Sequence, residues 1–215
     1  APRGLMQVFS DKTDWKEITE NLGKTWEIEL NTYKPFACGI VIHPAIDACV
    51  QLREKHNLKP EQVAKVTLKA HPLVQELTGK KTPTDGLLAK FSVFHACAVA
   101  LIYGRAGEHE YADDVVRSPL VIGVRDKVQL IVDRSIHEAS VDVTLETTDG
   151  QKHHIYIERA IGSLEKPMSN EQLKAKFVDQ STPILGTAKT EEAWNLCMSL
   201  AAQKDLKALL QSLTQ

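Results

Sequence analysis

The 215-residue sequence contains no apolar run of the about 18–20 residues that a membrane-spanning helix needs. Its longest apolar stretches, at 37–42 and 93–103, have the length of core elements. The net charge is also small, because 26 Lys and Arg residues stand against 28 Asp and Glu residues, which gives −2. A chain this close to neutrality has no global attraction to nucleic acid or to an anionic membrane. We therefore expect neither as a partner, and any anion site must be local.

Motifs for phosphate binding, serine hydrolysis and zinc proteolysis are missing as well. The sequence has no G-x-x-x-x-G-K-[ST], G-x-G-x-x-G, G-x-S-x-G or H-E-x-x-H pattern. Its four cysteines form no C-x-x-C pair, the short spacing on which zinc sites usually draw. His153 and His154 are neighbours on a predicted strand, so they face opposite sides and cannot share a metal. We expect no metal site.

Three of the cysteines, Cys38, Cys49 and Cys97, stand among apolar or small neighbours. This setting predicts buried free thiols in a reducing compartment. We therefore expect a cytoplasmic protein, or one of the mitochondrial matrix if the source is eukaryotic.

The rest of the composition is that of an ordinary globular protein, with 43% hydrophobic and 25% charged residues. Alternation of apolar and polar residues predicts strands at 26–31, 64–70, 128–133, 141–147 and 153–159. Helical spacing and end signals predict helices at 13–22, 44–56, 87–103 and 166–180, with a helix-rich stretch at 188–214. The order favours an α+β fold, in which an antiparallel or mixed sheet carries two helices on one face and a short helical tail follows.

We place a domain boundary near residue 165, between an α+β domain at 1–165 and a helical segment at 166–215. A tail of two or three helices buries little apolar area by itself. We expect it to pack on the α+β unit, on another subunit or on a helical domain outside this chain. The apolar helix 87–103 also needs a partner, which favours a homo-oligomer.

The first chemically interesting cluster is YKPFACGIVIHP at 33–44. Lys34 is held next to the stiff backbone of Pro35, and His43 stands at the start of a helix, where unpaired N–H groups favour anions. A lysine, a histidine and a helix start suit a carboxylate-bearing substrate. The same residues also fit a buried bend with an outward-reaching Lys34 and a capping His43.

The second cluster is GLLAKFSVFH at 86–95, on the apolar helix. It places a cation, a hydroxyl and an imidazole, those of Lys90, Ser92 and His95, on an otherwise apolar element. Either these groups bind a ligand, or Lys90 points outward and His95 is a hydrogen-bonded core residue.

At these clusters the sequence resembles the MmgE/PrpD family. The matches keep their order across about 1–180, which is more specific than any single motif. They comprise APRGLMQVF near the start, LGKTWEIELNTYKPFACGIVIHPAIDA (22–48), DGLLAKFSVFHACAVALIYG (85–104), YADDVV (111–116), the DG turn at 149–150 and GSLEKPMSNEQLKAKF (162–177).

The resemblance implies an enzyme that acts on small di- or tricarboxylates without a metal or organic cofactor. Members include 2-methylcitrate dehydratase, cis-aconitate decarboxylase and iminodisuccinate epimerase. Their shared chemistry begins with proton abstraction next to a carboxylate, followed by loss of water or carbon dioxide, or by reprotonation. It needs cations and N–H donors that hold carboxylates and enolate-like charge, together with a well-placed base.

Family members combine a large helical domain with a smaller α+β lid, followed by helices that return to the helical domain. The sequence resembles the lid and the returning helices, while the helical domain, which carries several active-site residues of the family, is not matched. The resemblance thus implies the C-terminal half of a longer enzyme, present as a fragment, a separately encoded subunit or part of a chain. Its partner is then a helical domain or another subunit, and the family is commonly dimeric.

The resemblance carries five residues over as substrate-binding candidates and leaves the catalytic residues unassigned. Lys34 matches the lid lysine that faces the cleft, and Lys90 and Ser92 match the basic and hydroxyl positions of a second lid motif. His43 matches a histidine common in the family, whose role can be structural. His95 stands where an aromatic residue is more usual.

Two positions depart from the cis-aconitate decarboxylases. Gly39 stands where those enzymes have an active-site histidine, and Glu76 falls close to their lid tyrosine. The first departure argues against simple itaconate-forming chemistry. Our first hypothesis is the lid portion of a lyase or isomerase whose active site this chain does not complete, and the alternative is a non-catalytic binding or assembly module that keeps the lid fold.

Overall fold

The structure is a computed structural model that describes residues 4–12 and 14–214. It divides into two compact units, Ala1–Thr32 and Tyr33–Gln215, which we describe separately. The described part of the first unit holds α1 (Leu5–Phe9), α2 (Trp15–Thr19) and the 3₁₀ helix η1 (Glu27–Leu30), and none of its described side chains is buried. The predicted helix 13–22 corresponds to α2, which Asp14 caps by accepting from the Lys16 amide; Thr13 lies outside the described residues.

The strand predicted at 26–31 is wrong, because Glu27–Leu30 forms η1. Trp26, Ile28 and Leu30 alternate as predicted for a strand, but all three are exposed. Alternation produces a strand only where a neighbouring strand pairs with the backbone. The described sheet has four strands, and this segment pairs with none of them.

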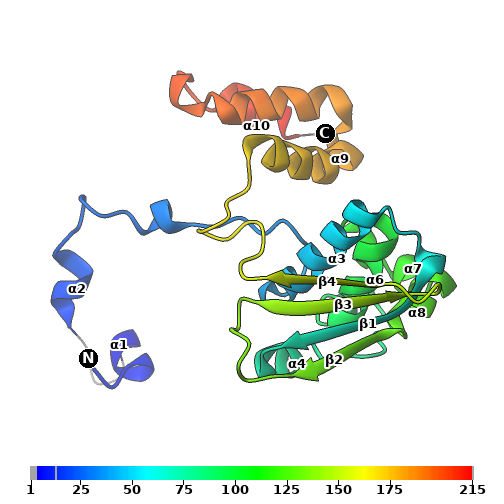
Figure 1. Cartoon of the computed structure of the whole chain (residues 1–215). Coiled ribbons are helices and arrows are strands. Elements are labelled where there is room, and N and C mark those ends of the chain that lie inside the picture. Colours follow the sequence, from blue (N-terminus) through cyan, green and yellow to red (C-terminus); the bar gives the residue numbers. More distant parts are fainter. Residues whose placement is uncertain (1–3, 13, 215) are drawn as a thin grey trace. The chain divides into compact units, whose positions relative to one another are not determined.

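The second unit is built on that mixed sheet (Figure 1). Its strands are β1 (Val63–Ala70), β2 (Val128–Val132), β3 (Val141–Thr147) and β4 (Lys152–Ile157), in the order β2-β1-β3-β4. β1 pairs in parallel with β2 and antiparallel with β3, and β3 pairs antiparallel with β4. The four later predicted strands and the turn at Gly150, whose φ is +85°, are confirmed.

Two long helices pack on one face of the sheet, as predicted. α3 (His43–His56) lies on β3 and β4, and α6 (Val93–Tyr103) lies on β2 and on α3. The core between the layers contains Ile46 and Leu52 of α3 and Leu68 and Leu145 of the sheet. Shorter helices complete the unit: η2 (Ile40–Ile42), η3 (Pro60–Gln62), α4 (Pro72–Thr78), η4 (His109–Tyr111), α7 (Asp113–Val116) and α8 (Pro119–Arg125).

The predicted helix 87–103 is interrupted. It consists of α5 (Gly86–Ala89) and α6, because the side chain of Ser92 caps α6 by accepting from the His95 amide at 3.1 Å. Serine favours such a cap over a helix interior. Gly104, with φ +70°, ends α6 as predicted.

The helical tail begins with α9 (Asn170–Met198), which is kinked at Gly186 and contains Pro183. Its start confirms the predicted capping box between Ser169 and Gln172. η5 (Leu200–Ala202) and α10 (Lys207–Ser212) follow, and α10 packs on α9. The domain boundary near residue 165 stays a prediction.

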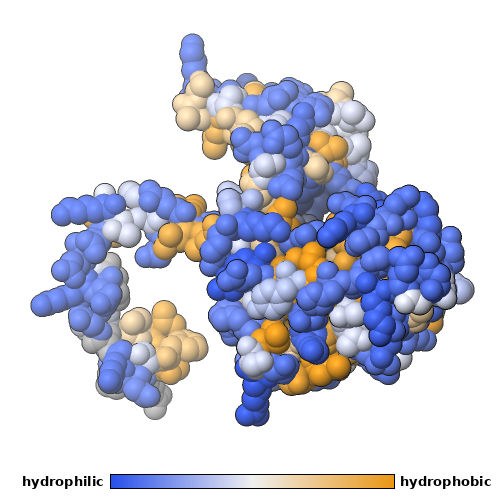
Figure 2. All heavy atoms as spheres, in the orientation of Figure 1, coloured by the Kyte–Doolittle hydropathy of each residue, from blue (hydrophilic) through white to orange (hydrophobic). Residues whose placement is uncertain are grey.

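Cys38, Cys49 and Cys97 are buried free thiols, as predicted, whereas Cys197 is exposed. Figure 2 shows hydrophilic residues over most of the visible face of the sheet-bearing body, with separate apolar areas among them. Within the part of the chain that the structure describes, no helix has the length and apolarity needed to cross a membrane.

Candidate functional site

The second unit contains a cavity of about 1160 Å³. Pockets that bind small molecules usually have volumes of about 300–1,000 Å³, so this cavity is large enough for such a ligand. Its wall is formed by the 34–39 segment, the outer face of α3, the loop after α6, the segment after β4, and one face of α9. The charged residues of the lining are the basic Lys34, Lys90, Arg105, Lys166 and Lys176 and the acidic Asp47, Glu54, Glu108 and Asp179.

Lys34 lines the cavity from a backbone segment that is held by contacts with Gly162 and with Lys176. On one side, Gly162 has φ +89°, and a Cβ built there would lie 2.3 Å from the Tyr33 carbonyl oxygen and 2.7 Å from Pro35 Cδ. Only glycine allows this approach. On the other side, Lys176 Nζ donates to the Lys34 carbonyl oxygen at 2.6 Å. The backbone that carries Lys34 is therefore held from both the 160–166 segment and α9.

Lys90 reaches the same wall from the C-terminal end of α5. Its carbonyl oxygen accepts from the Gly39 amide at 3.2 Å, which joins the two segments that the sequence singled out. Its ammonium group lies 2.7 Å from Glu108 Oε2, and the two side chains are 31% and 61% exposed. Lys34 and Lys90, 56 residues apart in the sequence, thus line one cavity.

Cys38 also lines the cavity. Burial raises the pKa of its thiol to about 11, although the ammonium groups of Lys34 and Lys90 both act in the opposite direction. The thiol is therefore protonated near neutral pH, and it is a poor nucleophile.

The structure places His43 outside the lining. Its side chain is buried at the start of α3, where its ring packs edge-on against Phe36 with centroids 5.3 Å apart. Burial lowers the pKa of the imidazole to about 4, so it is neutral at physiological pH. A contact between His43 and substrate stays a prediction.

Ser92 and His95 are fully buried and also lie outside the lining. Ser92 caps α6, and His95 Nε2 donates to the Glu110 carbonyl oxygen at 2.9 Å. His95 is thus a hydrogen-bonded core residue, which was one of the two alternatives predicted from the sequence. Burial lowers its pKa as well. Substrate binding by these two side chains stays a prediction.

Three basic residues of the lining were not predicted. Arg105 bridges Glu110 and Asp179, with nitrogen–oxygen distances of 2.9 and 3.2 Å. Lys166 and Lys176 stand in the text 162–177 that carries the family resemblance, but no spacing rule singles them out. They reach the cavity only because the segment after β4 turns back toward α3.

Asp47 of α3 anchors that returning segment. Its buried carboxylate accepts from the Ile161 amide and from Lys166 Nζ, both at 3.1 Å, and from Gln51 Nε2 at 2.7 Å. Hydrogen bonds to an ionised carboxylate are among the stronger ones in proteins. The wall formed by 161–168 is therefore tied to the helix on the opposite side.

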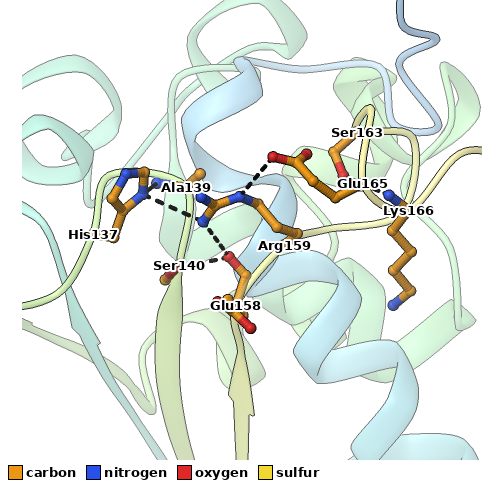
Figure 3. A network of polar contacts seen from close by, with 8 residues as sticks. All are labelled: His137, Ala139, Ser140, Glu158, Arg159, Ser163, Glu165 and Lys166. Carbon is orange, nitrogen blue, oxygen red and sulfur yellow. Dashed lines mark hydrogen bonds and ion pairs between the residues drawn. The ribbon is translucent and has the colours of Figure 1, made fainter.

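A second network fixes the same segment from the sheet side (Figure 3). Arg159 donates to the Glu158 carbonyl oxygen at 2.9 Å, to Glu165 at 3.3 Å and to His137 Nδ1 at 3.5 Å. Ser163 Oγ accepts from the Lys166 amide at 3.1 Å. The turn at 160–166 is thus held before the chain enters α9.

His153 and His154 point to opposite sides of β4, as predicted. His153 stacks on His56 of α3 with ring centroids 3.8 Å apart, and His154 Nε2 lies 3.1 Å from Asp142. No group of three or more His, Cys, Asp or Glu side chains in the described chain is arranged to hold a metal ion.

Comparison with known proteins agrees with the resemblance read from the sequence. The chain is 22% identical over 216 residues to a cis-aconitate decarboxylase of Aspergillus terreus, an alignment that covers 92% of this chain and 43% of that protein. The chain therefore spans less than half the length of this relative. The family model of the MmgE/PrpD C-terminal domain matches residues 36–200, which include the residues of the cavity lining except Lys34 and Pro35. Because that match covers well over half of the sequence, the chain belongs to the MmgE/PrpD family and carries its C-terminal domain.

Proposed function

We propose that this chain is the C-terminal part of an MmgE/PrpD lyase or isomerase that acts on a small di- or tricarboxylate. The reaction begins with proton abstraction next to a carboxylate and continues with loss of water or a similar step. The observation that carries the proposal is the single cavity that both Lys34 and Lys90 line.

The charges of the lining favour an anionic ligand. Its five basic residues stand against four acidic ones, a difference of +1. Lys90, Arg105 and Lys166 each have a carboxylate partner, namely Glu108, Asp179 and Asp47. Among the described residues, no carboxylate forms an ion pair with Lys34 or Lys176. Two cationic groups therefore remain for a ligand.

Such cations suit the chemistry of the family. Removing a proton next to a carboxylate moves negative charge onto that carboxylate, and a fixed ammonium group stabilises the transition state more than the ground state. Lys34 and Lys90, on separate segments, can each hold one carboxylate of the same molecule. Two fixed points then orient the C–H bond that breaks.

We assign the proton-abstracting base to another part of the enzyme. The described lining holds no imidazole, the Cys38 thiol is protonated near neutral pH, and three of the four carboxylates, those of Asp47, Glu108 and Asp179, are engaged in ion pairs. We assign the base to a helical domain or a partner subunit that closes over this cavity. Closure of that kind also excludes water and strengthens the ion pairs inside.

Decarboxylation is named for the Aspergillus relative, but Gly39 lies in the cavity wall at the position where the resemblance leads us to expect a catalytic histidine. We therefore favour dehydration or isomerisation for this chain. The test incubates the whole natural protein with methylcitrate, citrate, the aconitate isomers and related acids, and identifies products by nuclear magnetic resonance.

Lys34→Ala provides the matched variant for that screen. We expect it to raise KM or abolish turnover, since it removes an unpaired cation from the cavity. Lys189→Ala is the control, because Lys189 lies on α9 outside the lining and donates to the Thr214 carbonyl oxygen. Kinetics of Lys34→Ala equal to those of the control would remove Lys34 from the site.

A binding or assembly module is the second candidate, and Gly39 favours it. A module keeps the anion cavity but turns nothing over. Calorimetry separates the two: binding of citrate-like acids without products from any acid in the screen supports the module, and turnover excludes it.

A further inference from the structure

Lys176 is one of the three basic residues of the cavity lining that the sequence did not single out as substrate-binding candidates. It lies on the face of α9 that forms the cavity wall, together with Gln172, Ala175, Asp179 and Gln180. These positions follow helical spacing, so they share one side of the helix. Lys176 is half-buried, and its Nζ is fixed 2.6 Å from the Lys34 carbonyl oxygen.

The Lys176 ammonium group keeps unused hydrogen-bonding capacity. It has three N–H donors, and the contact with the Lys34 carbonyl oxygen uses one. No carboxylate in the described chain forms an ion pair with it, although Lys174, two residues earlier, pairs with Glu191 at 2.8 Å. Two donors and a full positive charge therefore remain available at the cavity wall.

The charges of Lys34 and Lys176 both act on the side chain of His43. Both disfavour protonation of the buried His43 imidazole, whose pKa is lowered first by burial. The neutral His43 adds no third charge and does not neutralise the other two. Lys176 Nζ is held at the backbone of Lys34, and no carboxylate among the described residues forms an ion pair with either lysine, so both charges favour an anion bound here.

We infer that Lys176 and Lys34 together bind one carboxylate of the substrate, which gives α9 a direct part in ligand recognition. The inference rests on the proposed function and extends it, because neither the sequence clusters nor the carried-over residues include Lys176. Lys90 is then left for a second carboxylate, and the site selects ligands with at least two.

The test must separate the charge of Lys176 from its role as a structural anchor. Lys176→Gln serves this purpose, because a glutamine amide can still donate to the Lys34 carbonyl oxygen but carries no charge. Lys189→Gln is the matched control, since Lys189 is on the same helix and donates to the Thr214 carbonyl oxygen at 2.7 Å, outside the cavity. The probe is tricarballylate, which carries three carboxylates and no hydroxyl group to eliminate.

Calorimetry on the whole natural protein measures the Kd of tricarballylate, and thermal unfolding checks that each variant is folded. We expect Lys176→Gln to weaken binding about tenfold or more, the usual effect of losing a charge-assisted hydrogen bond, while Lys189→Gln binds like the wild type. A Kd of Lys176→Gln equal to that of the control would overturn the inference and leave the proposed function standing.

A double-variant cycle with Lys34→Gln tests whether the two lysines share one carboxylate. If they do, the loss in the double variant is smaller than the product of the single losses, because groups on a common partner are not independent. Losses that multiply would place the lysines on separate carboxylates and contradict the inference. If the wild type binds no acid of the panel and turns none over, the proposed function fails, and this inference with it.

Discussion

Glu108 Oε2 lies 2.7 Å from Lys90 Nζ, and both residues line the cavity that also holds Lys34. The chain thus supplies its own carboxylate to Lys90, one of the three lysines that we expect to bind substrate. Exposed ion pairs contribute little to stability, typically about 0–1 kcal/mol. A substrate carboxylate can therefore displace Glu108 at small cost.

The first prediction follows from this competition. Glu108→Gln removes the internal carboxylate, and we expect it to lower the KM or Kd for a dicarboxylate by about two- to fivefold, the equivalent of an exposed ion pair. The measurement is steady-state kinetics or calorimetry on the whole natural protein. Increased ionic strength should reduce the difference between wild type and variant.

Glu146→Gln is the control for this experiment. Glu146 is 32% exposed and pairs with Lys152 at 3.5 Å, but it lies outside the cavity lining. We expect no change in KM from it. If Glu108→Gln instead weakens binding, Glu108 orients Lys90 for the substrate and does not compete with it.

The second prediction concerns the contact between Gly162 and the segment that carries Lys34. Gly162→Ala imposes a strained φ of +89° and also drives Cβ to 2.3 Å from the Tyr33 carbonyl oxygen. Gly150→Ala imposes the same strain at φ +85° but meets nothing within 4 Å. We expect both to lower the free energy of unfolding, and Gly162→Ala to cost about 1–3 kcal/mol more because of the clash.

Denaturant unfolding of the two variants measures that difference. Gly162→Ala should also weaken carboxylate binding, since Lys34 shifts with its backbone, whereas Gly150→Ala should leave binding unchanged. Equal losses of stability in the two variants would mean that the Tyr33–Pro35 segment yields easily, and that Gly162 does not hold Lys34 in place.

The sequence predicted the sheet-bearing unit well, for identifiable reasons. Alternation at 64–70 and 141–147 reflects one buried face of the sheet, and the DG turn fixes the hairpin. The same signal failed at 26–31, which pairs with no strand of the described residues. The single helix predicted at 87–103 is divided into α5 and α6, because the side chain of Ser92, a predicted substrate-binding residue, caps α6.

The candidate site was only partly predictable. Lys34 and Lys90 stood out because a cation in an apolar setting is unusual, and the hydrogen bond between Gly39 and Lys90 brings their segments together. Lys176 and Lys166 lie in a polar stretch where lysine is unremarkable. They reach the lining because Asp47 anchors the segment that returns after β4. The hydrogen bond that does this joins Asp47 to the Ile161 amide, 114 residues later in the sequence, and local sequence patterns do not predict such a contact.

The third prediction concerns the thiols. Cys38 lines the cavity beside two lysines, yet burial raises its pKa to about 11, so little thiolate is present at pH 8. We expect iodoacetamide to modify the exposed Cys197 first and Cys38 much more slowly, with the buried Cys49 and Cys97 also protected. Mass spectrometry of digested protein after timed labelling checks this order. Labelling of Cys38 as fast as Cys197 would show that the lysines outweigh burial.

The last prediction is a loss of stability in mild acid that depends on His43. Burial lowers the pKa of this imidazole from 6.5 to about 4, so between these values the unfolded chain binds a proton that the folded chain does not. The contribution of the neutral His43 to the free energy of unfolding is therefore fully present above pH 6.5. It falls as the pH drops toward 4, by up to about 3 kcal/mol. The lowered pKa of His95 acts in the same direction.

Denaturant unfolding at pH 8 and pH 5 measures how steeply the free energy of unfolding falls as the pH is lowered, for the wild type and for His43→Gln. At pH 8 the comparison reports only the loss of packing, because the imidazole is neutral in both states. The variant should lose stability less steeply than the wild type between the two values, whereas an equal slope would mean that His43 does not carry the effect.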